Sequence, residues 1–88
     1  MAKLGYVLMR YGLDGFGNEI GGSALCASAS YKKIHDQIRR VLEIEQREAD
    51  EDTRIYDYDK QVVVEYGGNY DDADEQGVRY IIESIEIL

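Results

Sequence analysis

The sequence has no proline, one cysteine and one histidine, and it contains no long apolar run. Because Cys26 is the single cysteine, an internal disulfide is excluded and a reducing, cytoplasmic location is indicated. No segment approaches the roughly 18 apolar residues of a membrane-spanning helix, and no signal peptide follows Met1. We therefore expect the 88 residues to form a single domain, with a core so small that dimerisation would stabilise it.

Positive charge is scarce in the second half of the chain. Residues 1–42 contain three acids and six bases, a balance of +3, whereas residues 43–88 contain fifteen acids and four bases, a balance of −11. Together these give the net charge of −8. An acidic half of this kind repels nucleic acid and anionic membranes and attracts basic surfaces. We expect a basic protein as the partner, and no direct contact with nucleic acid or membrane.

The longest periodic segment, residues 30–48, predicts an amphipathic helix. Its apolar residues recur at helical spacing and form one stripe for burial: Tyr31, Ile34, Ile38, Val41 and Leu42. Ser30 is the expected N-cap, because its hydroxyl can accept a hydrogen bond from a first-turn amide. On the outer surface, opposite charges four residues apart predict four ion pairs: Lys32–Asp36, Asp36–Arg40, Arg39–Glu43 and Glu43–Arg47.

The other segments predict an antiparallel sheet. Residues 3–11 have the pattern of a central strand, residues 12–22 of a glycine-rich hairpin turn or loop, and residues 19–29 of a weaker strand. The small side chains of that weaker strand would let the helix pack closely across the sheet. Residues 54–66 fit one long strand or, as we favour, a hairpin turning at Asp59 and Lys60. Residues 78–88 fit helical spacing, but their isoleucines favour a strand.

The expected fold is α+β, with an antiparallel β-sheet of about four strands and one α-helix packed on one face. The expected order along the chain is two strands, the helix and two further strands, with room for an extra hairpin.

No catalytic or ligand-binding motif is present. Gly15 and Gly17 lack the third glycine of a dinucleotide-binding loop, and no P-loop lysine follows them. Three neighbouring oxygen-bearing residues do not match the spacing of an EF-hand calcium loop: Asp14, Asn18 and Glu19. His35 and Cys26 alone supply too few nitrogen and sulfur ligands for a hydrolytic metal site. We therefore expect no enzymatic activity, no metal and no cofactor.

The acidic residues of the second half occur in groups, and tyrosines lie between them. Runs of acids usually form a solvated surface that confers solubility. The grouping also fits a binding surface, because carboxylates with aromatic anchors offer a basic groove both ion pairs and ring contacts. In a strand, Asp57 and Asp59 would share one face and Tyr56 and Tyr58 the other. The candidate partner-binding residues are Glu48, Asp50, Glu51, Asp52, Tyr56, Asp57, Tyr58, Asp59, Tyr70, Asp71, Asp72, Asp74 and Glu75.

In size, charge and acidic groups, the chain resembles the phage-encoded inhibitors, among them the anti-CRISPR proteins and other DNA mimics. The resemblance implies an inhibitor in the host cell cytoplasm that blocks the DNA or RNA site of a basic nucleic-acid-binding protein, with a CRISPR effector as the leading partner. The basic helix face, with Lys32, Lys33, Arg39 and Arg40, departs from the uniformly acidic mimics.

Two other functions stay open. The chain could be a phage or bacterial structural or assembly protein that forms a homodimer through a strand edge, with its acids serving solubility. A nucleic-acid binder that uses the basic helix face is the weaker alternative, because the acidic half lies so close in the chain.

Overall fold

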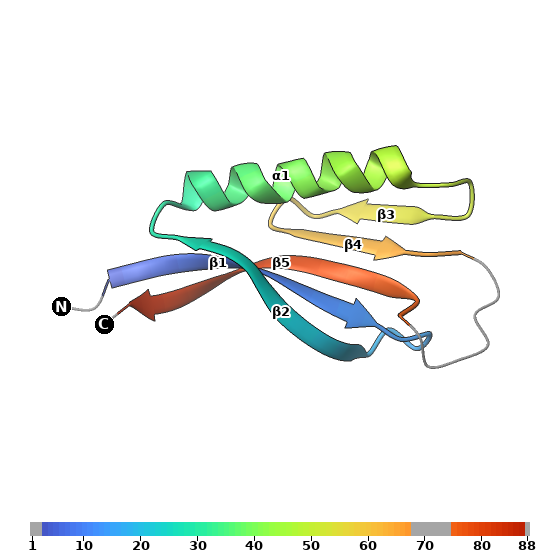
Figure 1. Cartoon of the computed structure of the whole chain (residues 1–88), viewed down its shortest axis with the longest axis horizontal. Coiled ribbons are helices and arrows are strands. Elements are labelled where there is room, and N and C mark those ends of the chain that lie inside the picture. Colours follow the sequence, from blue (N-terminus) through green and yellow to red (C-terminus); the bar gives the residue numbers. More distant parts are fainter. Residues whose placement is uncertain (1–2, 68–74, 88) are drawn as a thin grey trace.

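The computed structural model describes residues 3–67 and 75–87, which form a five-stranded antiparallel sheet with one helix packed on it (Figure 1). The elements are β1 (Lys3–Leu13), β2 (Glu19–Ser28), α1 (Tyr31–Glu48), β3 (Arg54–Asp57), β4 (Gln61–Glu65) and β5 (Gly77–Ile87). The strand order across the sheet is β2-β1-β5-β4-β3. The predicted α+β class is confirmed. The sheet has five strands instead of about four, because residues 54–66 form the favoured hairpin and add two short strands.

Strands β1 and β5 form the long centre of the sheet. They pair antiparallel over their full lengths, from Lys3 opposite Ile87 to Leu13 opposite Gly77. Since β1 also pairs with β2, its predicted interior position is confirmed. Residues 77–87 are a strand and not a helix, in keeping with their β-branched side chains, which pack well on a pleated surface.

Helix α1 covers one face of the sheet and closes the core. Its predicted N-cap is confirmed, since Ser30 Oγ accepts a hydrogen bond from the Lys33 amide over 3.4 Å. The buried residues of α1 pack against buried residues of β1, β4 and β5, and together they form the core: Leu8, Ile34, Ile38, Leu42, Val62, Val64, Val78 and Tyr80. The predicted apolar stripe is thereby confirmed, with Tyr31 and Val41 half-buried at its margins.

The four ion pairs predicted along the helix do not form among the described residues. Arg39 reaches Asp57 on β3 instead. The reason is geometric, because Arg39 lies on the flank of α1 that faces the β3–β4 hairpin. Two parallel hydrogen bonds to the Asp57 carboxylate there are stronger than a solvent-exposed contact with Glu43, one turn along the helix.

Strand β2 is an edge strand, and the prediction that the helix packs closely over its small residues is wrong. All residues from Glu19 to Leu25 are exposed, and within β2 only Cys26 packs against the core. In Figure 1, β2 starts far from the helix and approaches it only where the chain turns into α1. A register shift between Leu8 and Met9 of β1 adds an irregularity opposite this part of β2.

No helix of the described part of the chain covers the opposite face of the sheet, and polar side chains link the strands there. The Tyr11 hydroxyl donates a hydrogen bond to Glu83 over 2.8 Å, and Arg79 pairs with Glu19 over 2.8 Å. The Arg79 guanidinium also lies 5.5 Å from the centre of the Tyr11 ring. These contacts join β1, β2 and β5. Within residues 3–67 and 75–87, no helix has the length and apolar character needed to cross a membrane.

Candidate partner-binding surface

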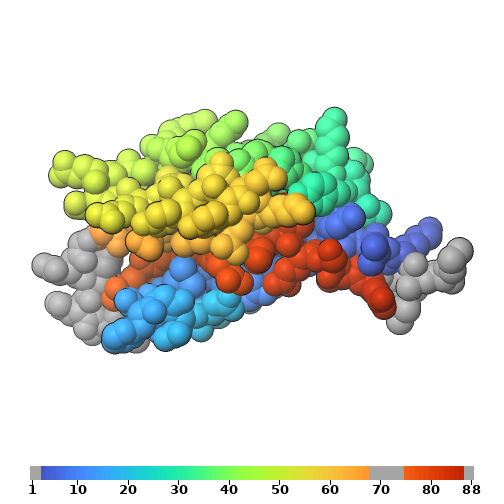
Figure 2. All heavy atoms as spheres, turned by 180° about the vertical axis from the view of Figure 1, so that it is seen from behind, coloured from blue at the N-terminus to red at the C-terminus, as the bar shows by residue number. Residues whose placement is uncertain are grey.

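One group of predicted site residues lies where α1 ends and the chain turns toward β3. Glu48 is the last residue of the helix, and Asp50, Glu51 and Asp52 follow it; all four side chains are exposed. None of them pairs with a base among the described residues. Figure 2 shows this turn, coloured yellow-green, projecting at a corner of the molecule. We call these four residues the acidic corner.

Asp50 fixes the backbone of the acidic corner. Its Oδ1 accepts hydrogen bonds from the Thr53 hydroxyl over 2.8 Å and from the Asp52 amide over 2.9 Å. These bonds lower the pKa of Asp50, because they stabilise its ionised form, and the bond from the Thr53 hydroxyl has the largest effect. The result is a defined turn that presents Glu51 and Asp52 to solvent.

The acidic corner stands at the helix end that disfavours anions. The C-terminus of a helix carries partial negative charge, and Arg47 is the one base in the last turn of α1. A hollow of about 190 Å³ beside the corner is lined by Glu45, Glu48, Asp50 and Tyr66, among others. Glu45, which was not among the predicted site residues, accepts a hydrogen bond from Tyr80 over 2.8 Å there. Negative potential is therefore concentrated at this end of the molecule.

Asp57 and Asp59 both face α1, as predicted for a strand, although β3 ends at Asp57 and Asp59 lies in the turn with a φ of 69°. Both are paired within the chain. Arg39 donates two hydrogen bonds of 2.7 Å to the two carboxylate oxygens of Asp57. His35 Nε2 lies 2.8 Å from Asp59 Oδ1. The guanidinium of Arg39 lowers the pKa of Asp57 to about 2. Sequence reasoning missed both pairings, because helix and hairpin partners stand 18 and 24 positions apart with no pattern connecting them.

Tyr56 and Tyr58 share the other side of the hairpin, again as predicted. Their rings are nearly parallel, at an interplanar angle of 10° and a centroid separation of 6.5 Å. Tyr58 is 61% exposed, whereas Tyr56 is half-buried. The exposed ring of Tyr58 is therefore the one available to a partner.

Glu75 is also paired within the chain, with Arg10 of β1. The hydrogen bond with the Glu75 carboxylate raises the pKa of Arg10. The remaining predicted site residues lie outside the described residues: Tyr70, Asp71, Asp72 and Asp74. Of the thirteen candidates, the structure gathers four in the acidic corner and, as a separate group, four in the hairpin at residues 56–59.

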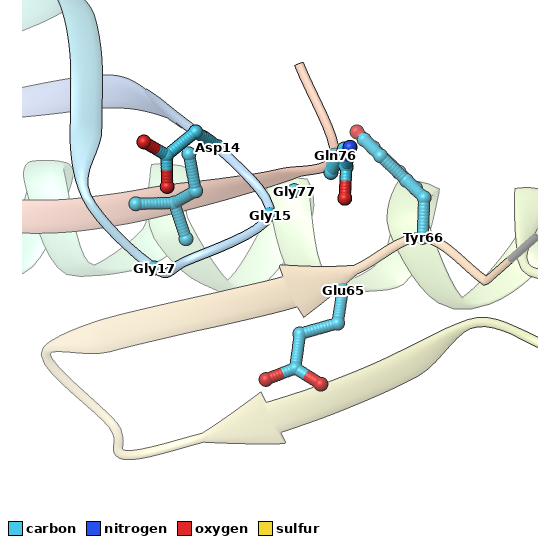
Figure 3. A pocket seen from close by; sticks show the side chains of 8 residues that line it. Asp14, Gly15, Gly17, Glu65, Tyr66, Gln76 and Gly77 are labelled. Atoms are coloured by element: carbon cyan, nitrogen blue, oxygen red, sulfur yellow. The ribbon is translucent and has the colours of Figure 1, made fainter. Parts of the chain in front are cut away.

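The glycine-rich segment forms the β1–β2 hairpin turn. A hollow of about 250 Å³ separates this turn from the ends of β4 and β5 (Figure 3). Asp14 Oδ1 accepts hydrogen bonds from the amides of Phe16, over 2.8 Å, and Asn18, over 2.9 Å. Figure 3 shows Asp14 and Glu65 pointing away from each other, so their carboxylates do not converge on the hollow. The carboxylate of Asp14 is used to hold the turn.

Within residues 3–67 and 75–87, no group of three or more His, Cys, Asp or Glu residues is placed to hold a metal ion. Comparisons with protein-family models, curated proteins and solved structures found no match to this chain.

Proposed function

We propose that this chain is a small acidic inhibitor that binds a basic nucleic-acid-binding protein and blocks its DNA or RNA site. The main support for the proposal is the acidic corner. Its four side chains, Glu48, Asp50, Glu51 and Asp52, are exposed, and none forms an ion pair with a basic residue in the described part of the chain. A turn held by hydrogen bonds presents these charges, so little conformational entropy is lost when a partner binds. A CRISPR effector in the host cytoplasm is the leading partner, and no catalytic step is involved.

The hairpin contributes differently from the corner. Asp57 and Asp59 already face Arg39 and His35, so a partner would have to displace those contacts to use them fully. The exposed ring of Tyr58 needs no such displacement and can stack on an arginine or insert into a pocket. The proposed interface therefore joins the acidic corner to Tyr58.

The test is affinity capture from a bacterial lysate, with and without nuclease treatment, followed by competition with DNA and RNA. We expect the captured protein to be a nucleic-acid binder that is recovered better after nuclease treatment and is displaced by added nucleic acid. Capture of a protein that keeps its nucleic acid bound in the same complex would contradict the proposal.

A matched pair of variants makes this test specific. Glu48→Gln, Glu51→Gln and Asp52→Asn together remove three charges from the acidic corner and leave Asp50 to hold the turn. The control removes three exposed charges elsewhere: Asp36→Asn, Glu43→Gln and Glu86→Gln. Both variants have the same net charge. We expect only the corner variant to lose the captured partner.

A structural or assembly protein that self-associates through a strand edge is the second candidate, with the acids serving solubility. It is favoured by one observation, the exposed edge of β2, which carries no charged residue from Ile20 to its end at Ser28. Its test is the mass of the chain in solution across a concentration series, where a stable dimer would favour this function over the inhibitor.

A further inference from the structure

Among the described residues, no strand pairs with the outer edge of β2. Strand β2 pairs with β1 and is the last strand of the sheet on that side. No charged residue and no proline occurs between Ile20 and Tyr31. Natural edge strands usually carry lysine, proline or a covering segment that prevents another strand from pairing with them. Along β2 the backbone donors and acceptors are therefore open to an incoming strand.

A groove runs between β2 and the start of α1. It has a volume of about 480 Å³, and its lining includes Cys26 and Ser28 of β2 and Lys33, Ile34, Asp36 and Arg40 of α1. The strand side is small and uncharged, and Ile34 adds a buried apolar side chain. Because a strand edge forms one wall of the groove, the groove suits an extended peptide more than a compact ligand.

The helix side of the groove is basic. Lys33 and Arg40 are seven residues apart and so lie on the same flank of α1, about 10 Å from each other along the axis. Neither forms an ion pair within the described part of the chain, and Asp36 is the one acid that lines the groove. The same flank continues to Ile44, which is 43% exposed. Two cations without partners therefore face a strand edge without a partner.

We propose that this groove binds an extended, acidic segment of a partner protein, which pairs with β2 as an additional strand. Backbone hydrogen bonds to β2 would supply affinity, as in other cases of strand addition. Side chains two or four residues apart in a strand point to the same face, about 7 or 13 Å apart, so acids at such positions can reach Lys33 and Arg40. This site is separate from the acidic corner and goes beyond the proposed inhibitory function.

The charges favour an acidic partner over a second copy. A two-fold interface brings the same surface of both copies together, so the shared groove would contain Lys33 and Arg40 from each. Those four positive charges would face only the two Asp36 carboxylates. The chain has a net charge of −8, but its acidic half repels an acidic peptide only over short distances, because the screening length at physiological salt is about 8 Å.

The first test is selection of ten-residue peptides from a random display library on the immobilised chain. We expect enriched peptides that carry acids at alternate positions and bind about tenfold more weakly to the Lys33→Glu/Arg40→Glu variant, since that variant loses both exposed ion pairs. Lys32→Glu/Arg54→Glu is the matched control, because it reverses two exposed bases that do not line the groove; it should change the affinity little. Failure to enrich peptides, or enrichment without acids, would overturn the proposal.

Cys26 supplies a second readout, because this half-buried thiol lines the groove. We expect a selected acidic peptide to slow the alkylation of Cys26 by iodoacetamide, and not to do so in the Lys33→Glu/Arg40→Glu variant. Unchanged alkylation with bound peptide would place the peptide elsewhere and refute the site.

Sedimentation equilibrium without peptide tests whether a second copy of the chain occupies the groove instead. A dimer that is dissociated by Leu25→Glu would assign the β2 edge to self-association and would also overturn the proposal.

Discussion

Arg39 of α1 and Asp57 of β3 form a two-point ion pair, with both N–O distances at 2.7 Å. A third hydrogen bond, from Arg39 Nη2 to the Asp59 carbonyl oxygen over 2.8 Å, extends the contact into the β3–β4 turn. The pair therefore connects the helix to the hairpin beside it. It also neutralises one of the carboxylates that the sequence offered for binding a partner.

Replacing Asp57 by asparagine should weaken this connection. The pKa of Asp57 is about 2 in the folded chain, below its ordinary value of 3.8. Because the folded pKa is lowered, its contribution to stability is full above about pH 4 and is lost as the pH falls toward 2. At pH 7 we expect Asp57→Asn to lower the free energy of unfolding by less than about 1 kcal/mol, because the pair is partly exposed.

Urea denaturation of both proteins at several pH values checks this prediction. The difference between wild type and Asp57→Asn should shrink as the pH is lowered from 5 toward about 2. Asp36→Asn is the control, since Asp36 is exposed and has no ion pair with the described residues. A difference that persists unchanged at low pH would show that the Arg39–Asp57 pair does not stabilise the fold.

Ile38 should be among the residues most important for stability. It is 0% exposed and lies at the centre of the stripe by which α1 contacts the sheet. Ile38→Ala should lower the free energy of unfolding by about 2–5 kcal/mol, since it removes buried methyl groups and leaves a cavity. In a domain of this size that loss can unfold the chain. Ile44→Ala, at a position that is 43% exposed, is the control and should change stability little. Equal melting temperatures for the two variants would contradict this assignment of the core.

The β1–β2 turn should bind no ligand. Gly17, with a φ of 81°, and the two hydrogen bonds accepted by Asp14 account for the conformation of the turn. A ligand that binds only the folded chain must stabilise it. We therefore expect Ca²⁺, Mg²⁺ and ATP to leave the melting temperature unchanged. A saturable rise of several degrees, lost in Asp14→Ala, would instead identify a site at this turn.

The sequence predicted the parts of the fold that depend on local periodicity. The spacing of Ile34, Ile38 and Leu42 located the helix, and the strand alternation of residues 54–57 placed Tyr56 and Asp57 on opposite sides of the hairpin. These features were predictable because they arise within a few residues of chain.

Long-range relationships were not predictable. Arg10 and Glu75 meet across 65 positions, and Arg39 meets Asp57 because the hairpin lies beside the helix. The edge position of β2 depends on which strands pair, and its small residues fit an open edge as well as a covered one. For the same reason the sequence showed which residues are acidic, but not which of them the fold leaves unpaired.

The last prediction concerns the proposed inhibitor itself. Exposed ion pairs contribute about 0–1 kcal/mol each, so single changes such as Glu51→Gln should weaken the complex only slightly. Neutralising Glu48, Glu51 and Asp52 together should weaken it steeply. Isothermal titration calorimetry with the captured partner measures both effects. The affinity should also fall with added salt, because the screening length shortens from about 30 Å at 0.01 M to about 3 Å at 1 M.

The ring of Tyr58 allows a further comparison within the same complex. Tyr58→Ala should cost more affinity than any single acid if the ring is buried by the partner, since aromatic anchors dominate interface energies. Tyr56→Ala is the comparison, because Tyr56 is half-buried in the free chain and exposes less of its ring. A partner that binds equally well in high salt and tolerates both the acidic-corner variant and Tyr58→Ala cannot be held by this surface. In that case the acids serve solubility, and self-association through a strand edge becomes the better account of the chain.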